Sequence, residues 1–371
     1  MHGKLHMQLD RASETMCEKR SSTLRPSNTK GCIKANNFGR QRDAVSDVCQ
    51  KKPENHSCRF TVCTPTFNRG RTLHRVYDSL IQQTCQDFEW LIIDDESTDN
   101  TAEIVQRMRK EAPFEIRYLW QRHGHKKAAV NYGAKAANGE FILIWDSDDA
   151  APPTAMEDLL AAWDGIPSHQ RESFAGVWGV CALPSGEIVG KEYPANIVDS
   201  DHASIQYRYR VCGEKWGFVR TKILREFPYP ETVQGYVPEG VVWARIGKHY
   251  KTRYINKVVR FYYDECDSLT RRRSGAWDNA PGLALWAAEV LGEQQRFFWK
   301  CPGVFFHAAV NATRFWLHGV VRGKGVRLPR LPVFARLLLY LCAPVGLLVF
   351  CRDFAGESQV ILPARGKLSV E

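Results

Sequence analysis

The sequence predicts an α/β protein built around a mostly parallel, doubly wound central sheet. Two apolar runs, 90–93 and 141–145, are short and uninterrupted, and both lead directly into acidic residues. Such runs suit strands that are buried on both faces of a parallel sheet. Strand-like and helix-like segments alternate along the first half of the chain with short connections, which is the pattern of a doubly wound fold.

The elements can be placed in order from their patterns. A strand at 59–64 leads into a turn at 65–70, and an amphipathic helix follows with Leu73, Val76 and Leu80 on one stripe. The strand at 90–93 precedes a helix for which Ser97 and Asp99 are both plausible N-caps. We then expect a strand at 116–120, a helix at 127–137 that ends at Asn138-Gly139, a strand at 141–145, a helix at 154–163, and a hairpin of 176–181 with 187–190.

Composition and charge limit the function classes. The chain has 371 residues and a net charge of +10, and this surplus suits nucleic acid, an anionic membrane face or a phosphorylated substrate. The basic residues lack the interleaved aromatic residues of a nucleic-acid module, so nucleic acid is disfavoured as a partner. The twelve cysteines include no C-x-x-C pair, so we expect free thiols in a reducing cytosol and no zinc site.

Three regions are expected along the chain. Residues 1–57 are polar and basic without periodicity, have no apolar signal segment, and are interpreted as a disordered or mis-annotated extension. Residues 58–270 form the main domain, with a nucleotide-binding half at 58–150 and an acceptor half at 151–270. Residues 271–371 form a C-terminal helical region.

The most apolar stretch of the chain is 331–350, which contains one charge, Arg336, and an internal Pro344. A spanning helix needs about 20 apolar residues, so this stretch is marginal for that role. Basic residues on both sides suit an element that lies on an anionic cytoplasmic leaflet. We therefore expect a membrane-associating segment; a spanning helix and a buried helical hairpin remain the alternatives.

Acidic residues follow both apolar strands, and this position suggests chemistry. Ligands of open α/β sheets bind beyond the carboxyl ends of the strands, so the two acidic clusters should meet at one edge. In Asp146-Ser147-Asp148-Asp149, alternation lets two carboxylates face one divalent cation, which could bridge two phosphate oxygens. A solvated turn is the alternative, because Asp and Ser are common turn residues. Asp95 could accept a hydrogen bond from a base or a ribose hydroxyl, whereas Asp99 is better explained by helix capping.

These pieces occur in an order that resembles a known family. Residues 62–101, VCTPTFNRGRTLHRVYDSLIQQTCQDFEWLIIDDESTDNT, and residues 126–153, KKAAVNYGAKAANGEFILIWDSDDAAPP, are similar to the family 2 glycosyltransferases. The resemblance is dense over 59–160 and looser to about 270. It implies the GT-A fold, a Rossmann-like nucleotide-binding architecture.

The resemblance also implies roles for individual residues. The turn after the first strand would lie beside the nucleotide, Asp95 would bind the uracil or an equivalent base, and a helix would face the sugar nucleotide. Asp148 and Asp149 would contact the ribose and a divalent metal, Mn²⁺ or Mg²⁺, with Asp146 supporting them. The residues so implied for donor binding are Pro65, Thr66, Asn68, Asp95, Lys127, Asn131, Asp146 and Asp148, and those for the metal are Asp148 and Asp149. For Lys127 a solvated helix start is an equal alternative.

An inverting sugar transfer also needs a base that removes the proton of the acceptor hydroxyl. The family places an acidic residue at the start of a helix for this purpose, and Glu239 fits, although Gly240 stands where many relatives have a second acid. The alternative is that Glu239 only favours a helix N-terminus. Glu214 is the rival base, and Trp216 is expected to form an acceptor-side wall. Arg271-Arg272-Arg273 is either a solvated loop or a holder of a lipid diphosphate.

We therefore predict a metal-dependent, inverting glycosyltransferase that uses a nucleoside-diphosphate sugar, with UDP as the expected nucleotide, and a glycan or lipid-linked acceptor. Cell-surface polysaccharide or lipopolysaccharide assembly at the inner face of the plasma membrane is the setting that the resemblance implies. A non-catalytic sugar-nucleotide-binding scaffold with the same fold is the alternative. A nucleotidyltransferase is disfavoured because 65–71 offers no Gly-rich basic loop, and the absence of G-x-x-x-x-G-K and G-x-G-x-x-G loops disfavours nucleotide hydrolases and nicotinamide enzymes.

Overall fold

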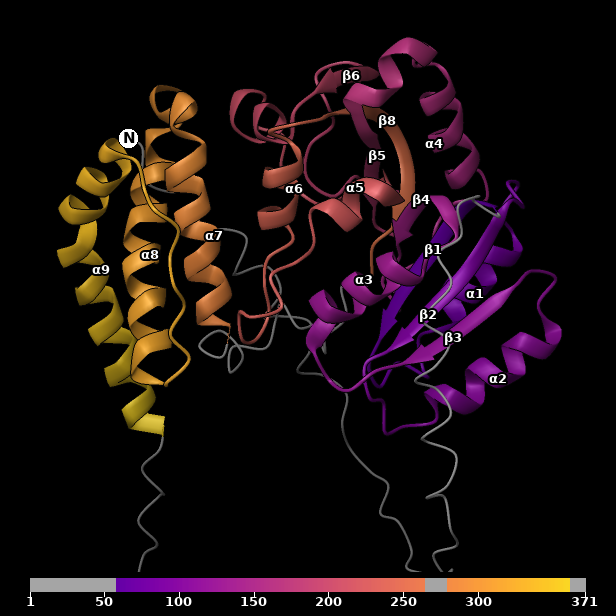
Figure 1. Ribbon diagram of the computed structural model, residues 1–371, viewed down its shortest axis with the longest axis horizontal. Coiled ribbons are helices and arrows are strands. Elements are labelled where there is room, and N and C mark those ends of the chain that lie inside the picture. The colour runs from indigo at the N-terminus through magenta and orange to yellow at the C-terminus, as the bar shows by residue number, and fades with distance from the viewer. Residues whose placement is uncertain (1–57, 264–278, 361–371) are drawn as a thin grey trace, which may run out of the picture. The chain divides into compact units, whose positions relative to one another are not determined.

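The computed structural model describes residues 58–263 and 279–360. Eight strands form one sheet in the order β3-β2-β1-β4-β7-β5-β8-β6, with helices on both of its faces (Figure 1). Strands β1 (Cys58–Thr66), β2 (Phe88–Asp94), β3 (Ile116–Trp120) and β4 (Gly139–Ile144) pair in parallel. They alternate with α1 (His74–Ile81), α2 (Thr101–Glu111) and α3 (His125–Ala136), so the predicted doubly wound half is confirmed.

The apolar runs in these strands are uninterrupted because each strand packs against a hydrophobic core on both faces of the sheet. Along β4, Phe141 and Leu143 pack into the core on one face of the sheet, together with α1, α2 and α4 (Ala155–Asp164). The intervening Ile142 and Ile144 pack into the core on the other face, with α3, α5 (Thr221–Glu226) and α6 (Gly240–Ile246). Successive side chains of a strand point to opposite faces, so both sets must be apolar.

The second half of the sheet is mixed. β7 (Lys215–Arg220) is antiparallel to β4 and to β5 (Phe174–Ala182), while β8 (Lys251–Phe261) is parallel to β5, and the short β6 (Ile197–Ser200) closes the edge. Short helical turns occupy Ser168–Ser173 and Ser204–Arg208.

The predicted hairpin of 176–181 with 187–190 is wrong in its second arm. The turn exists, because the Leu183 amide donates to the Glu187 carbonyl at 2.8 Å, but beyond it only Ile188 makes a single bridge, to Ala182. The physical reason is that β7 and β8 occupy both edges of β5, which leaves no free edge for a longer arm.

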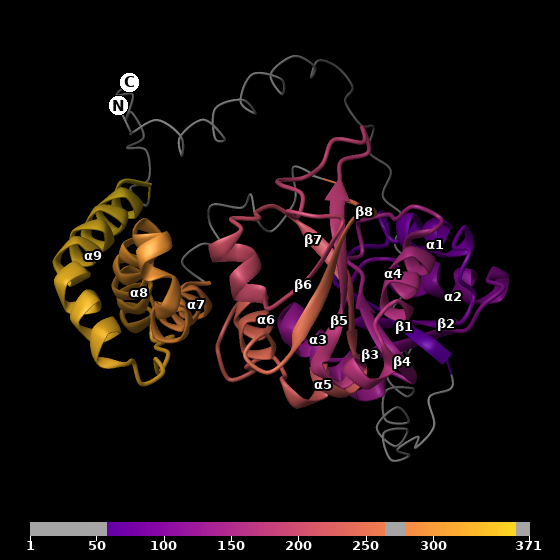
Figure 2. The ribbon, with the colours of Figure 1, turned by 90° about the horizontal axis from the view of Figure 1, so that it is seen from above.

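Three longer helices follow the sheet. They are α7 (Ala280–Glu293), α8 (Pro302–Val321) and α9 (Val333–Val360), with a helical turn at Gln295–Lys300 between the first two. Figure 2 shows the three helices side by side, with α8 between α7 and α9. The predicted apolar segment 331–350 therefore forms most of one long helix that contains Pro344. Among the described residues, α9 is the one helix long and apolar enough to cross a membrane, over Val333–Ala355, by length and composition alone.

Candidate active site

The acidic residues that end β2 and β4 lie at one edge of the sheet. Strand β1 lies between β2 and β4, and all three are parallel. Asp95 therefore follows one strand and Asp146 to Asp149 follow another at the same carboxyl edge. The strand order therefore places the two acidic clusters at the same edge of the sheet, as the sequence predicts.

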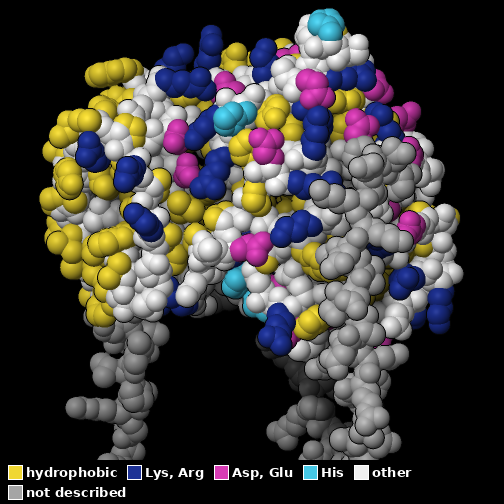
Figure 3. Space-filling model, in the orientation of Figure 1, with side chains coloured by type: hydrophobic (Ala, Val, Ile, Leu, Met, Phe, Trp, Pro, Cys, Tyr) yellow, Lys and Arg dark blue, Asp and Glu magenta, His cyan; other side chains and the backbone are white. Residues whose placement is uncertain are grey.

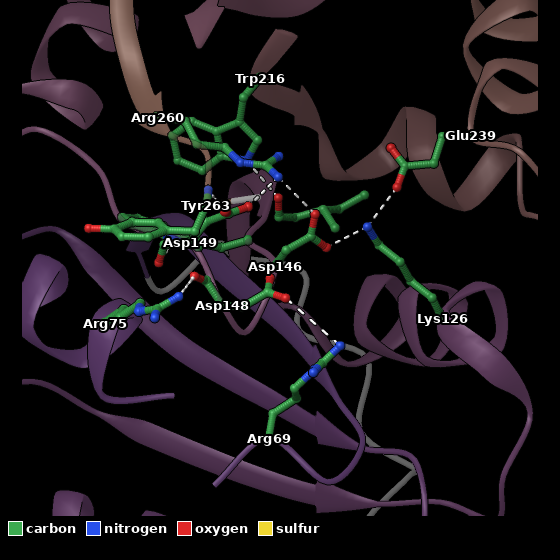
Figure 4. A network of polar contacts seen from close by, with 12 residues as sticks. Arg69, Arg75, Lys126, Asp146, Asp148, Asp149, Trp216, Glu239, Arg260 and Tyr263 are labelled. Carbon is green, nitrogen blue, oxygen red and sulfur yellow. Dashed lines mark hydrogen bonds and ion pairs between the residues drawn. The ribbon is translucent and has the colours of Figure 1, made fainter. Parts of the chain in front are cut away.

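Asp146 is held between two cations (Figure 4). One carboxylate oxygen contacts the Lys126 ammonium, and the other lies 3.1 Å from Nη2 of Arg260 on β8. Burial disfavours the charged form of this carboxylate, but Lys126 and Arg260 outweigh burial and hold the pKa of Asp146 at about 2. Asp146 is therefore a fixed negative charge that orients Lys126.

Asp149 is the most enclosed acid of the cluster, with 1% of its surface exposed. Its carboxylate contacts the Arg260 guanidinium and accepts a hydrogen bond of 3.0 Å from the Tyr263 amide. Burial raises the pKa of Asp149, while Arg260 acts against that rise. Both oxygens thus have protein partners, so this structure departs from the expectation that Asp149 faces a metal.

Asp148 has looser contacts than its neighbours, and its side chain is 24% exposed, close to the 27% of Asp146. Its carboxylate lies 3.9 Å from Nη2 of Arg69, and its backbone carbonyl accepts a hydrogen bond of 2.9 Å from Arg75. Burial, followed by the charge of Asp146, raises the pKa of Asp148. Arg75 in turn lies over the Tyr263 ring at 4.3 Å. Asp148 is the carboxylate of this cluster that a ligand can reach with least rearrangement.

These carboxylates fit a divalent cation only together with oxygen ligands from a bound substrate. Within 58–263 and 279–360, no group of three or more His, Cys, Asp or Glu side chains could hold a metal by itself. Hard divalent cations in phosphate-transfer sites are usually held by one or two carboxylates together with the oxygens of the substrate phosphates. The open carboxylate of Asp148 suits that mode, in which the cation and the diphosphate bind together.

Glu239 points toward the acidic cluster from the opposite side. It stands directly before α6, and its Oε1 lies 2.7 Å from the Lys126 ammonium that also contacts Asp146. Figure 4 shows Lys126 between the two carboxylates. The neighbouring Gly240 has little room for a side chain: a Cβ there would lie 3.0 Å from Nε1 of Trp286. A second acid at this position would require the indole to move.

Asp95 is buried at 3% exposure and already has several partners. Its Oδ1 accepts hydrogen bonds from the Gly124 amide at 2.8 Å and from Gln121 at 2.6 Å, and Oδ2 lies 2.8 Å from Nδ1 of His123. The loop between β3 and α3 therefore covers this carboxylate, and Asp95 fixes the loop that leads into α3, where Lys126 is the second residue.

The predicted pair on α3, Lys127 and Asn131, faces away from the acids. Lys127 is buried and its ammonium donates to the carbonyls of Val233 and Gly235. Asn131 donates to the Tyr229 carbonyl at 2.9 Å. Both residues anchor the segment that leads to Glu239, so the structure corrects the expectation that Lys127 faces a phosphate: Lys126 is the lysine at the site.

Two predicted acceptor residues lie on or beside β7. Trp216 is 4% exposed, donates from Nε1 to the Ile144 carbonyl at 2.7 Å and packs on Trp145. Its ring is therefore part of the core and is not an exposed acceptor wall. Glu214 is exposed beside the strand, and no hydrogen bond or ion pair among the described residues holds its carboxylate.

The turn after β1 is ordered by its own polar groups. Asn68 has a φ of 54° and accepts hydrogen bonds from the amides of Thr98 and Asp99. The Thr66 side-chain oxygen is buried without a hydrogen-bond partner within the described residues, and Pro65 precedes it at the end of β1. The predicted turn thus lies at the same sheet edge as the acids.

Sequence reasoning missed Lys126, Arg260 and Arg69. Lys126 differs from Lys127 only by the rotation of a helix, and the Lys-Lys pair gives no signal for which one faces the sheet edge. Arg260 reaches the acids from β8, 114 residues after Asp146 in the chain. The Arg271 to Arg273 run lies outside the described residues.

Comparisons with known proteins agree with this geometry. Residues 61–181 match the model of the family described as glycosyl transferase family 2. A cholesterol galactosyltransferase of Borreliella burgdorferi is 31% identical over 263 residues, which cover 67% of this chain and 72% of that enzyme. The chain is 26% identical over 209 residues to a Campylobacter jejuni β-1,3-glucosyltransferase named for GalNAc(5)-diNAcBac-PP-undecaprenol, covering 55% of this chain but only 64% of that enzyme.

Among solved structures, Staphylococcus aureus TarS, residues 1–349, superposes with a TM-score of 0.53 at 16% identity and covers 80% of this chain and 92% of TarS 1–349. This likeness shows the fold. The fold and the site therefore define a GT-A glycosyltransferase. The chain belongs to glycosyltransferase family 2.

Proposed function

We propose that this glycosyltransferase is an inverting enzyme that moves a sugar from a nucleoside-diphosphate donor, expected to be UDP-linked, to a lipid-linked or glycan acceptor. The observation that carries the proposal is the bridge of Lys126 between Asp146 and Glu239. It joins the carboxylate cluster at this sheet edge to the acid directly before α6 through one side chain. A donor diphosphate and an acceptor hydroxyl can therefore bind side by side within one small site.

Glu239 is the base in this proposal. An inverting transfer is a single displacement at the anomeric carbon, in which the acceptor hydroxyl loses its proton as the new bond forms. Glu239 is partly exposed and ion-paired, so its carboxylate is both available to an acceptor and fixed in direction. Lys126 is a positioning residue that holds Glu239 and Asp146 together.

The leaving diphosphate needs positive charge around it. Arg69 is the cation nearest to the open Asp148 carboxylate, and Lys126 lies on the other side of the cluster. A divalent cation bound by Asp148 would add Lewis-acid stabilisation of the negative charge on the leaving group. Arg260 acts indirectly, because its contacts with Asp146 and Asp149 fix the loop that presents Asp148.

The acceptor class is proposed from relatives. The Campylobacter enzyme is named for an undecaprenol diphosphate-linked glycan and the Borreliella enzyme for cholesterol, so both act on lipids or lipid-linked molecules. We extend this to the present chain and place its work at the inner face of the plasma membrane, in cell-surface polysaccharide synthesis.

The test is release of nucleoside diphosphate from a panel of UDP-sugars and other nucleoside-diphosphate sugars, with Mn²⁺ or Mg²⁺ and undecaprenyl-diphosphate glycans as acceptors. We expect acceptor-dependent release with at least one donor and a product whose anomeric configuration, read by NMR, is opposite to that of the donor. Donor binding without release on any acceptor would favour the non-catalytic scaffold, and retained configuration would contradict the single displacement.

A further inference from the structure

The outer face of α9 is apolar and open. Leu337, Tyr340, Leu341 and Leu348 are between 63% and 72% exposed, and 22% of the most apolar stretch of the helix is buried. Figure 3 shows hydrophobic side chains gathered over this side of the molecule, with Lys and Arg side chains among them. A contiguous face of exposed apolar side chains marks an interaction surface.

The inner face of the same helix is well packed. Ala335, Leu338 and Cys342 are at most 6% exposed and join the core that α9 shares with α7 and α8. The helices also approach closely, because a Cβ at Gly346 would lie 2.7 Å from the Cβ of Thr313 on α8. The helix is therefore docked as a unit, and the open face is a property of the folded molecule.

The charges around this face select its partner. From 322 to 352 the chain has six basic residues and no Asp or Glu; the basic residues are Arg322, Lys324, Arg327, Arg330, Arg336 and Arg352. A basic segment beside an apolar helix complements the anionic headgroups of a bilayer, with each Lys or Arg near the surface contributing attraction. A second copy of this chain would bring like charges together, which disfavours self-association through this face.

Two features argue against α9 crossing a bilayer, although its length and composition alone would allow it. The uncharged run between Arg336 and Arg352 is 337–351, fifteen residues, whereas a spanning helix needs about 20. In addition, Asp353 lies within the apolar stretch and is fixed to α8, since its Oδ2 lies 2.6 Å from Nε of Arg314 and 3.3 Å from Nε2 of His318. Crossing would require this partly buried ion pair to break or to be carried into hydrocarbon, and both are costly.

We propose that the outer face of α9, with the basic residues at 322–336 and at Arg352, binds the surface of an anionic lipid bilayer with α9 lying in the headgroup region and not spanning. This inference does not depend on the proposed sugar transfer, because its readout is membrane binding alone. It supplies a physical means for the enzyme to meet a lipid-linked acceptor.

The experiment is flotation of the full chain with two kinds of vesicle, pure phosphatidylcholine and phosphatidylcholine with about a third phosphatidylglycerol. We expect binding to the anionic vesicles that is at least about tenfold stronger than to neutral ones and weakens with salt. Alkaline carbonate should release the protein. Equal binding to both vesicles with resistance to carbonate would show a spanning helix and overturn the proposal.

Two triple variants test the apolar part and the basic part of the surface separately. Leu337→Gln, Leu341→Gln and Leu348→Gln together, or Arg327→Gln, Arg330→Gln and Arg336→Gln together, should each lower binding to anionic vesicles roughly tenfold or more. The matched control is Ile197→Gln, an exposed apolar residue on β6 with 56% exposure, which should leave binding unchanged. Wild-type thermal unfolding in all three variants shows that the fold is intact. No vesicle binding by the wild type, with an oligomer that the leucine variant dissociates, would instead show that a second copy covers the face.

Discussion

The Lys126 ammonium lies 2.7 Å from the Glu239 carboxylate and also contacts Asp146. It thereby connects α3, the loop after β4 and the start of α6, which are brought together only by the fold. A cation that contacts two carboxylates fixes their separation.

Replacing Glu239 by Gln should remove sugar transfer while sparing donor binding. The amide keeps the size of the side chain but cannot accept a proton, and general base catalysis typically contributes about 10²–10⁴-fold in rate. Steady-state turnover and calorimetric titration with UDP measure the two effects. The control is Glu293→Gln on α7, an acid whose partner is the surface Lys248, which should turn over normally. Unchanged turnover in the Glu239 variant would move the base elsewhere, with Glu214 as the next candidate.

The adjacent lysines should behave differently. Lys126→Ala should lower kcat roughly ten- to hundredfold, which corresponds to loss of a charged hydrogen bond of about 1.5–3 kcal/mol. Lys126→Arg should restore part of the rate, because a cation again bridges the two acids.

Lys127→Ala should instead lower the free energy of unfolding by roughly 1–3 kcal/mol, since the carbonyls of Val233 and Gly235 lose their donor. Urea unfolding of both variants measures the change in stability, and initial rates measure the change in catalysis. A larger rate loss in the Lys127 variant than in the Lys126 variant would reverse our assignment.

Substitutions of Asp148 and of Asp149 should also have different effects. Asp148→Asn should weaken metal-dependent binding of UDP roughly tenfold or more, because the open carboxylate is lost as a cation ligand. Thermal shift with UDP, titrated with Mn²⁺ and repeated after EDTA, measures this. An unchanged manganese titration would exclude Asp148 as the ligand.

Asp149→Asn should mainly destabilise the fold, by about 1.5–3 kcal/mol, because the buried Arg260 loses one of its two carboxylate partners and keeps only Asp146. Denaturant titration provides the value, and Asp158→Asn, at a more exposed ion pair with Lys257, is the control with a small expected effect.

The thiols should fall into two reactivity classes. Burial raises the pKa of Cys63 and of Cys181 to about 12, and only thiolates react readily with alkylating agents. Cys212 and Cys351 are exposed. Iodoacetamide at neutral pH, followed by peptide mass spectrometry, should label the exposed pair under native conditions and the buried pair only in urea. Native labelling of Cys63 would show that β1 is not enclosed as described.

The first half of the fold was predictable because its signals are local. Continuous apolar runs define β2 and β4, and an amphipathic stripe defines α1. Each signal lies within the element that it specifies. The prediction of a hairpin after β5 was wrong for the opposite reason. Both edges of β5 are paired with β7 and β8, which come later in the chain and give no local signal near β5.

The sequence by itself determined the class of chemistry, since acids that follow buried parallel strands must gather at one edge. The tertiary structure decided which side chains share that edge. It selected Lys126 over Lys127, brought Arg260 from β8 to Asp146 and Asp149, and buried Trp216 in the core. The reason is physical: strand direction is encoded by local hydrophobic pattern, whereas the contacts of a charged side chain depend on helix rotation and on partners that only the packed sheet brings within a few ångströms.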